Sequence, residues 1–417
     1  MSSLIKPFRG LRPIPERAAD IAAPPYDVLN TAEARARAEG RPLSFLHISK
    51  PEIDLPASTD PYAPEVYEKG AENLTRLIGD GILVRDAEPC YYAYRLRMGK
   101  HAQTGLVCAG SVAAYDANRI RKHEFTQLQK EDDRVRQITA LNAQTGPVLL
   151  TYRATDAVRQ ILDGVVAGQP LYDLVADDGI GHTVWLIDDP AKINQLTDAF
   201  DPMEALYIAD GHHRSAAASR VAAAFDETQE RPSKKNGRGA DHHYFLCVAF
   251  PDVETQILDY NRVVRDLNGL GIDELLDRIG AAFSVAPSDT AVKPNRPASF
   301  GMYVGGRWYR LDISPSLISD DPVAGLDVSL LQDHLLTPLL GIGDPRTDDR
   351  IDFVGGIRGL AELERRVDNG DMKIAFSLYP TSMDALMAVA DANEVMPPKS
   401  TWFEPKLADG LVSHVLD

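Results

Sequence analysis

The chain has 417 residues, a formal net charge of −17 at pH 7 and a pI of about 5.0. So acidic a chain lacks the basic surface that neutralises phosphates, which excludes a nucleic-acid-binding role and adhesion to anionic membranes. The length predicts two or three domains, with 44% hydrophobic and 25% charged residues as in ordinary globular proteins. A small anionic ligand is still compatible, because a few local donors outweigh distant charges beyond a screening length of ~8 Å.

Three features bear on cellular location. No window approaches the ~20 apolar residues of a membrane span, and residues 1–7 lack the apolar run of a signal peptide. Cys90, Cys108 and Cys247 lie in apolar, strand-like runs without CxxC spacing, which favours buried, reduced thiols. We therefore expect a cytoplasmic protein.

Residues 1–110 are predicted to form an N-terminal α/β module. Pro24 and Pro25 make the segment before Tyr26 and Asp27 rigid and extended. Asn30 or Thr31 is expected to cap a helix over 31–39, which Gly40 ends. Apolar spacing predicts a second helix over 62–78 and a strand over 89–97.

Residues 111–265 are predicted to form a central domain. The pattern predicts strands at 106–115, 147–152, 183–187, 205–209 and 243–250, and helices at 132–143, 190–200 and 215–225. Residues 230–239 are polar, basic and glycine-bearing, which predicts a mobile loop.

Residues 266–417 are predicted to form a C-terminal α/β module. Helices are expected at 272–283, 328–336, 359–366 and 383–394, and strands at 299–304, 307–313 and 374–378, with Gly305-Gly306 as a hairpin turn. The fold class is accordingly α+β, a mixed α/β architecture.

The strongest local motif is the run from Leu206 to Ala218, in which an apolar strand meets Asp210-Gly211-His212-His213-Arg214 and then a small-residue helix. The start of a helix leaves backbone N–H groups unpaired and carries partial positive charge, so the turn predicts a phosphate site. Gly211 permits close approach of a ligand, and the histidines and Arg214 add donors. The alternative is a capped strand–helix junction with hydrogen-bonded histidines.

A second cluster comprises Arg121-Lys122-His123-Glu124-Phe125, followed by Lys130 and Arg134. Burial would raise the pKa of Glu124 and the cations would lower it, so Glu124 is a candidate general base. Lys130 and Arg134 are candidate contacts to a nucleotide. The alternative is a solvated charged loop that leads into a helix.

Two further segments carry weaker signals. In the run 396–406, Lys-Ser-Thr lacks the glycines of a P-loop, and Lys399 or Lys406 is left as a candidate anion contact in what is otherwise a packed extended segment. His242-His243 has no second ligand pair at a recognisable spacing, so we predict no metal site.

Nearly the whole chain resembles a bacterial family known only as a domain of unknown function. The resemblance rests on Ala23-Pro24-Pro25-Tyr26-Asp27-Val28, Lys122-His123-Glu124-Phe125-Thr126, Ala209-Asp210-Gly211-His212-His213-Arg214 and residues 396–401. Residues 110–250 are also similar, more distantly, to the superfamily of free serine kinase, ParB and sulfiredoxin. The turn holds no cysteine for sulfiredoxin chemistry, and the acidic chain shows no helix-turn-helix for ParB-like partitioning.

The kinase resemblance implies roles for single residues. Gly211, His212, His213 and Arg214 would grip the nucleotide phosphates, Asp210 would contact the serine, and Glu124 would be the catalytic base. About 85 residues separate Glu124 from Asp210, which implies an insertion near 155–180. The expected fold is then a serine-kinase-like central domain flanked by two α/β modules.

The resulting hypothesis is a kinase for a small hydroxylated metabolite, free L-serine first, which uses ATP or ADP with Mg²⁺ and the catalytic residues Glu124, Asp210 and His212. One alternative is an ATP- or CTP-binding switch without turnover. Another is a metal-dependent phosphohydrolase that uses Asp210, His212 and His213. An amino acid and a nucleotide are the expected partners, and a homodimer is left open.

Overall fold

The computed structural model describes residues 3–228 and 240–416 and divides the chain into two compact units. Unit 1 comprises Met1–Thr255 and Pro405–Asp417, and unit 2 comprises Gln256–Glu404. This division differs from the three modules expected from the sequence. The expected boundary at 110/111 falls inside strand β5 (His101–Ser111), which pairs with neighbours from both expected modules. The predicted loop at 230–239 lies outside the described residues.

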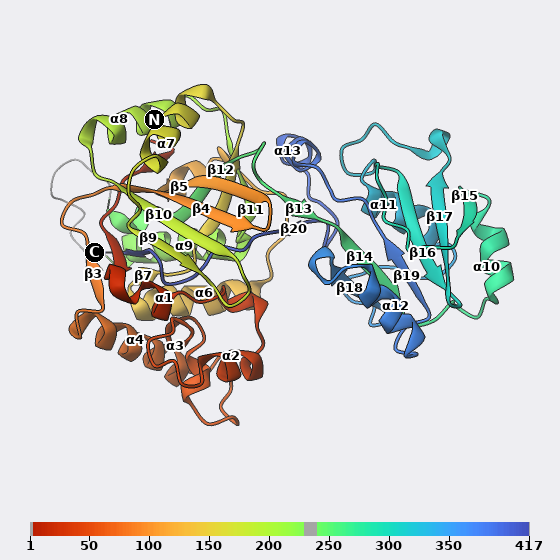
Figure 1. Cartoon of the computed structure of the whole chain (residues 1–417), viewed down its shortest axis with the longest axis horizontal. Coiled ribbons are helices and arrows are strands. Elements are labelled where there is room, and N and C mark those ends of the chain that lie inside the picture. The colour runs from red at the N-terminus through yellow and green to blue at the C-terminus, as the bar shows by residue number, and fades with distance from the viewer. Residues whose placement is uncertain (1–2, 229–239, 417) are drawn as a thin grey trace. The chain divides into compact units, whose positions relative to one another are not determined.

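Among the described residues, unit 1 contains the helices expected over 31–39, 62–78, 132–143, 190–200 and 215–225, most of them with shifted ends, together with four helices that were not predicted. They are α1 (Ala18–Ile21), α2 (Thr31–Ala38), α3 (Leu46–Ser49), α4 (Pro64–Gly79), α5 (Val112–Asp116), α6 (Leu128–Leu141), α7 (Asp156–Val166), α8 (Pro190–Phe200) and α9 (His212–Thr228). In α2, Asn30 and Glu33 form a reciprocal capping box, which confirms the predicted start. Figure 1 shows α2, α3 and α4 grouped together, and α4 packs against α6.

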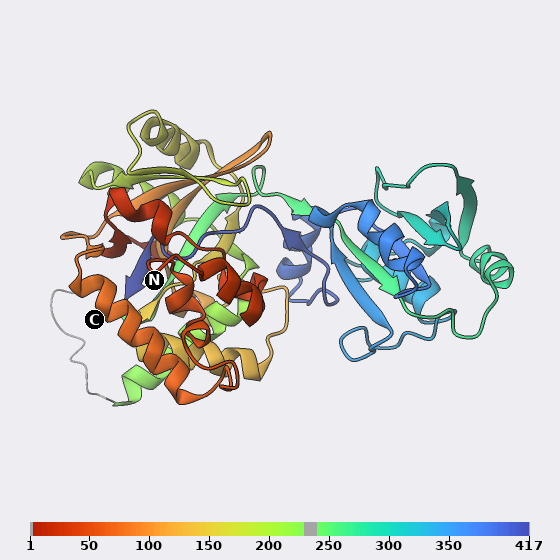
Figure 2. The same cartoon turned by 60° about the horizontal axis from the view of Figure 1, so that its bottom comes forward.

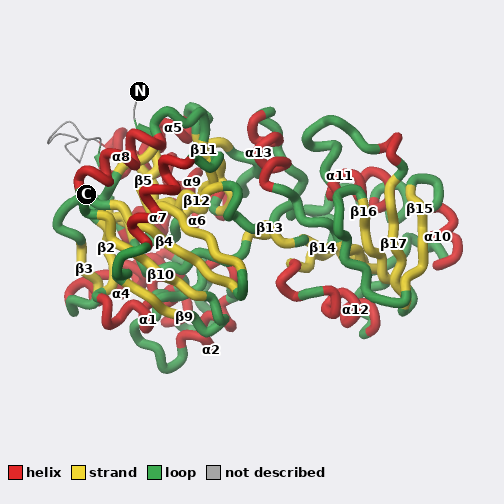
Figure 3. The backbone as a smooth tube through the Cα atoms, turned by 45° about the horizontal axis from the view of Figure 1, so that its top comes forward, coloured by secondary structure: helices red, strands yellow, loops and turns green. Residues whose placement is uncertain are grey.

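Unit 1 is built around a nine-stranded mixed sheet with the order β6-β11-β8-β12-β5-β4-β10-β9, in which β1 also pairs with β5. Besides β5, these strands are β1 (Ile5–Lys6), β4 (Tyr91–Met98), β6 (Ile120–Arg121), β8 (Val148–Tyr152), β9 (Tyr172–Val175), β10 (Gly181–Ile187), β11 (Leu206–Asp210) and β12 (Tyr244–Pro251). A smaller sheet joins β3 (Leu83–Arg85), β2 (Gly10–Pro13), β21 (Ser413–Val415) and β7 (Ala143–Gln144). Figure 3 shows the strands of the large sheet in yellow. The C-terminal strand β21 therefore belongs to unit 1.

Two predicted elements of unit 1 need correction. Residues 112–115 were expected to continue a strand, but they form α5, because the Ser111 hydroxyl accepts the Ala114 N–H and caps a helix there. The helix expected at 132–143 begins earlier, at Leu128. Residues 155–180, where the resemblance implies an insertion, contain α7 and β9.

Unit 2 is a six-stranded antiparallel sheet with helices. Its order is β15-β17-β16-β19-β14-β18, and β13 pairs with β20 beside it. Its elements are β13 (Ile257–Leu258), β14 (Tyr260–Val264), α10 (Ile272–Ile279), β15 (Phe283–Ser288), β16 (Ser299–Val304), β17 (Arg307–Ile313), α11 (Asp327–Leu331), β18 (Ile351–Gly355), α12 (Leu360–Asp368), β19 (Ile374–Ser377), α13 (Met383–Asp391) and β20 (Trp402–Phe403). The Gly305-Gly306 hairpin is confirmed, with φ of 58° and 76°. Three helices are shorter than predicted: α10 ends at Ile279, before β15 begins at Phe283, residues Gln332–Leu336 form a π-helix after α11, and α13 ends at Asp391. Figure 2 shows the helices of this unit beside its strands.

The mixed α/β class is confirmed by these elements. The predicted burial of the cysteines is confirmed, because Cys90, Cys108 and Cys247 are buried, and they form no disulfide. Within the two described stretches, no helix combines the length and apolar character needed to cross a membrane.

Candidate functional site

The turn after β11 has the abrupt strand-to-helix geometry expected from the sequence. Gly211 adopts φ of +102°, and its carbonyl accepts the N–H groups of Arg214 at 2.9 Å and Ser215 at 3.0 Å. The chain thus changes from strand to helix α9 over one residue. Among the described residues, the N–H groups of His212 and His213 have no acceptor, which leaves two donors at the helix start.

The positive φ of Gly211 makes this turn intolerant of a side chain. A Cβ at this position would lie 3.1 Å from Cζ and Nε of Arg214 and 3.3 Å from Cα of Val148. We expect Gly211→Ala to destabilise the protein by about 1–3 kcal/mol, the cost of a strained backbone position. Gly164→Ala, at an open helical position, should be neutral or stabilising. Equal urea midpoints for both variants would contradict this account of the turn.

Asp210 ends β11 and is held by two cations. Its Oδ2 accepts from Lys406 Nζ at 3.2 Å, and its Oδ1 lies 3.6 Å from a terminal nitrogen of Arg214. Burial opposes ionisation of Asp210, but Lys406 and Arg214 together hold the pKa of its carboxyl well below the ordinary value. Asp210 is therefore a carboxylate at every physiological pH.

The two histidines of the turn are neutral hydrogen-bonding groups. Burial and the neighbouring His123 lower the pKa of His212 well below its usual range, and burial together with Lys130 lowers that of His213. The His212 Nε2 accepts the His123 N–H at 3.4 Å, and the His213 Nε2 accepts the Gln127 N–H at 3.1 Å. Each imidazole therefore carries its proton on Nδ1 and presents a donor there.

Glu124 lies beside this pair. Its Oε2 is 3.8 Å from Nδ1 of His212, and its side chain is 46% exposed. His123 packs edge-on against His212 at 4.5 Å between ring centroids, and its Nδ1 is buried without a partner in the described residues. Of the titratable groups, His123, Glu124 and His212 place ligand-type atoms within 4.8 Å of one another, a set that contains neither Asp210 nor His213.

Arg214 is more buried than we expect of an arginine that contacts a phosphate directly. Its side chain is 9% exposed, and its guanidinium donates to the Pro147 carbonyl and lies 3.8 Å from Asp27 Oδ2. Burial disfavours its charged form, but Asp27 and Asp210 more than compensate and raise its pKa. Asp409 adds a further carboxylate whose charge favours the cation. Arg214 therefore links the N-terminal segment, the turn and the C-terminal tail.

Asp409 faces this cluster with both carboxyl oxygens buried and without a hydrogen-bond partner in the described part of the chain. Burial raises its pKa to about 7, against the opposing effect of Arg214. The folded state thus binds a proton more tightly than the unfolded state, whose Asp has a pKa near 3.9. The contribution of Asp409 to the free energy of unfolding is fully present below about pH 4 and is lost as the pH rises towards 7.

This linkage predicts the behaviour of Asp409→Asn. Between pH 5 and pH 7, the wild type should lose about 2 kcal/mol of unfolding free energy relative to the variant, which cannot ionise there. Urea denaturation at both pH values measures the difference, with Asp163→Asn on an exposed helix face as control. If the difference in unfolding free energy between the wild type and the variant did not change with pH, the raised pKa of Asp409 would be contradicted.

The remaining predicted site residues differ in their contacts. Lys130 is exposed on the first turn of α6 and lies close enough to His213 to affect its pKa. Arg134 stacks over the Tyr26 ring at 3.8 Å and bonds to Asp133 at 2.6 Å, so its contacts are with the protein. Of the two candidate lysines, Lys406 meets Asp210, whereas Lys399 belongs to unit 2.

Sequence reasoning missed part of this cluster. Asp27 was not among the predicted site residues, yet it lies 3.8 Å from Arg214, and its position after two prolines was the available signal. No sequence pattern marked Asp409 as a site residue. Its position near Arg214 depends on the antiparallel bridge between Ala23 and Asp409. Such a pairing joins residues far apart in sequence.

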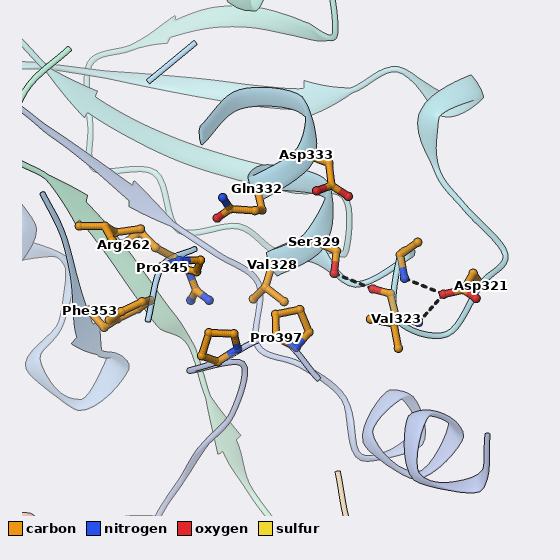
Figure 4. Close-up of a pocket in the computed structure, with 13 residues that line it drawn as sticks. Arg262, Asp321, Val323, Val328, Ser329, Gln332, Asp333, Pro345, Phe353 and Pro397 are labelled. Carbon is orange, nitrogen blue, oxygen red and sulfur yellow. Dashed lines mark hydrogen bonds between the residues drawn. The ribbon is translucent and has the colours of Figure 1, made fainter. Parts of the chain in front are cut away.

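Unit 2 contains a separate cavity of about 290 Å³ (Figure 4). Its lining is Arg262, Asp321, Val323, Ala324, Val328, Ser329, Gln332, Asp333, Pro345, Ile351, Phe353, Pro397 and Pro398. Arg262 donates to the Tyr260 carbonyl and to the Lys399 carbonyl at 3.0 Å, and burial lowers its pKa to about 10. None of the predicted site residues lines this cavity.

Comparisons with known proteins identify one family. The model described as "Protein of unknown function (DUF1015)" matches residues 5–329. No curated protein matches the chain. Among solved structures, free serine kinase in complex with AMP is 12% identical, with a TM-score of 0.33, and the match covers 74% of this chain and 92% of that one. C-terminally truncated SbnI from Staphylococcus aureus is 11% identical, with a TM-score of 0.38 over 73% and 85% of the two chains. A conserved hypothetical protein from Pyrococcus furiosus is 12% identical, with a TM-score of 0.33 over 73% and 93%.

Proposed function

The chain belongs to the DUF1015 family of proteins of unknown function, and we propose that it is a nucleotide-dependent kinase for a small hydroxylated metabolite, with free L-serine as the first candidate. The observation that carries the proposal is the pair of unpaired N–H groups of His212 and His213 at the start of α9. Lys130 is close enough to the His213 imidazole to affect its pKa, and Lys406 pairs with Asp210 at the end of β11.

This arrangement supports the proposed phosphate binding. The helix start supplies two backbone donors and partial positive charge, and the His213 Nδ1–H adds a side-chain donor. Lys130 approaches from α6 and Lys406 from the C-terminal tail. Arg214 supports the site from below, because its buried guanidinium fixes the turn through Pro147 and Asp27.

Glu124 is the proposed base for the substrate hydroxyl. It is the exposed carboxylate next to the neutral His212, whose Nδ1–H points towards it and would orient it. Asp210 stays ionised between Lys406 and Arg214, so it would accept a hydrogen bond from the amino acid. Phosphoryl transfer depends mainly on such positioning and charge neutralisation.

The residues present fit a nucleotide-bound Mg²⁺ ion. Mg²⁺ is usually held by one or two carboxylates together with substrate phosphates. Asp27 is an exposed carboxylate beside the turn, with its side chain 42% exposed, and it would supply such an oxygen. The ion would neutralise charge on the phosphates.

The test is direct detection of product. The purified protein is incubated with ATP or ADP, Mg²⁺ and a pool of hydroxy amino acids, and phosphorus NMR follows O-phospho products. We expect phosphoserine to form, and the Glu124→Gln variant to form little. Absence of any phospho-product with every donor would contradict the kinase.

The contacts of Arg214 favour a second candidate, a nucleotide-binding switch. Arg214 ties Asp27 and the turn together, so a bound phosphate that drew the guanidinium away would release the N-terminal segment. ATP or CTP would then raise the melting temperature without product. The same incubation separates the two functions.

A further inference from the structure

A cluster of two histidines and one aspartate lies in unit 1 at the far end of α9. The Nε2 atoms of His242 and His243 each lie 3.0 Å from Oδ1 of Asp226, and the His243 Nε2 is also 3.0 Å from Oδ2. All three ligand atoms lie within 4.8 Å of one another. None of these residues takes part in the proposed kinase site.

Local geometry does not by itself produce this convergence. His242 and His243 are consecutive residues of a 3₁₀ helix (Asp241–His243), where neighbouring side chains diverge by about 120°. Both rings nevertheless end at one carboxylate oxygen, which comes from a helix 16 residues away in sequence. The rings pack at 4.4 Å between centroids, and Phe225 packs edge-on against His242.

The donor set and its exposure define the class of ligand. Two imidazole nitrogens and one carboxylate oxygen are the ligands that Zn²⁺ and related divalent transition metals use in three-residue sites. His242 is buried, whereas His243 and Asp226 have side chains 37% and 55% exposed, which leaves one side open to solvent. We propose that Asp226, His242 and His243 form a binding site for a divalent transition-metal ion, with Zn²⁺ as the representative, and that water completes the coordination.

Metal binding would connect helix α9 to strand β12. Asp226 belongs to the last turns of α9, and the histidines immediately precede β12. An ion held by all three would fix the end of the helix to the start of a central strand. The site therefore acts on the stability of unit 1 rather than on a reacting group.

The test is a Zn²⁺ titration of the full-length protein against a chromophoric chelator. We expect the wild type to bind Zn²⁺ at this cluster, and Asp226→Asn and His243→Ala each to weaken that binding by at least tenfold. Asp226 is exposed and His243 is partly exposed, so we expect both variants to fold, which circular dichroism checks. His334→Ala, which removes a histidine in unit 2, should bind as the wild type does.

Co²⁺ gives the site a spectroscopic readout. The wild type should show the visible absorption of four-coordinate Co²⁺, and Asp226→Asn should lose it. Glu124→Gln separates this cluster from the other group of ligand atoms near His212 and should retain both Zn²⁺ and the Co²⁺ spectrum. Wild-type affinity in Asp226→Asn and His243→Ala, no uptake by the wild type, or loss of uptake in Glu124→Gln alone would each overturn the proposal.

Discussion

Replacing Glu124 with glutamine is expected to lower the turnover number by about 10²–10⁴-fold, the usual contribution of a general base. The amide keeps the size of the side chain but cannot take up the hydroxyl proton. The side chain is 46% exposed, so the unfolding free energy should change little. Steady-state kinetics of phosphoserine formation measure kcat and KM separately, and the loss should fall on kcat.

The matched control is Glu204→Gln, which neutralises a carboxylate that is 85% exposed and pairs with Arg121 in the same unit. Its turnover should equal that of the wild type. Wild-type kcat in Glu124→Gln would remove Glu124 from the mechanism. An equal loss in both variants would show that the effect is one of general charge.

Replacing Arg214 with alanine is expected to lower the free energy of unfolding by about 3–5 kcal/mol, the cost of removing one partner from a buried charged cluster. Asp27, Asp210 and Asp409 would lose the cation that they share, and the Pro147 carbonyl would lose a donor. Urea denaturation followed by circular dichroism measures the change.

Two further variants sharpen this prediction. Arg159→Ala removes an exposed arginine paired with Asp156 and should cost less than about 1 kcal/mol. Asp27→Asn combined with Arg214→Ala should recover part of the loss, because it removes one of the carboxylates that pair with Arg214. A small effect of Arg214→Ala, or no recovery in the double variant, would contradict the role of Arg214 as the central link.

Local elements could be predicted from the sequence because their signals are local. Asn30 and Glu33 cap α2 reciprocally, and Gly211 marks the abrupt change from β11 to α9. The strand expected over 106–115 was predicted too long, because the apolar run continues past Ser111 and the hydroxyl cap at Ser111 was not recognised. Apolar content alone does not distinguish a strand from a short buried helix.

The organisation of the chain could not be predicted in the same way. Strand β5 gathers β1, β4 and β12 from segments on both sides of residue 110, so one large sheet joins what appeared as two modules. The last residues return to unit 1 through β21, and Lys406 and Asp409 come with them. These pairings are non-local, and no periodicity of a single segment encodes them.

Part of the candidate site was nevertheless accessible from the residues. Residues 210–214 and Glu124 meet in space, as His212 shows by its contacts to both segments. Arg214 was expected to contact phosphate directly, but in the structure its guanidinium is buried among carboxylates. The histidine pair at 242–243 lacked a visible partner in the sequence, because Asp226 becomes a neighbour only when α9 returns to β12.

The most direct measurement of the central claim is a crystal structure of the full chain with ADP and Mg²⁺. We expect the terminal phosphate to accept the N–H groups of His212 and His213 at the start of α9, with Lys130 and Lys406 at its sides. Nucleotide bound in the cavity around Arg262 in unit 2, with the turn after β11 left without phosphate, would contradict it.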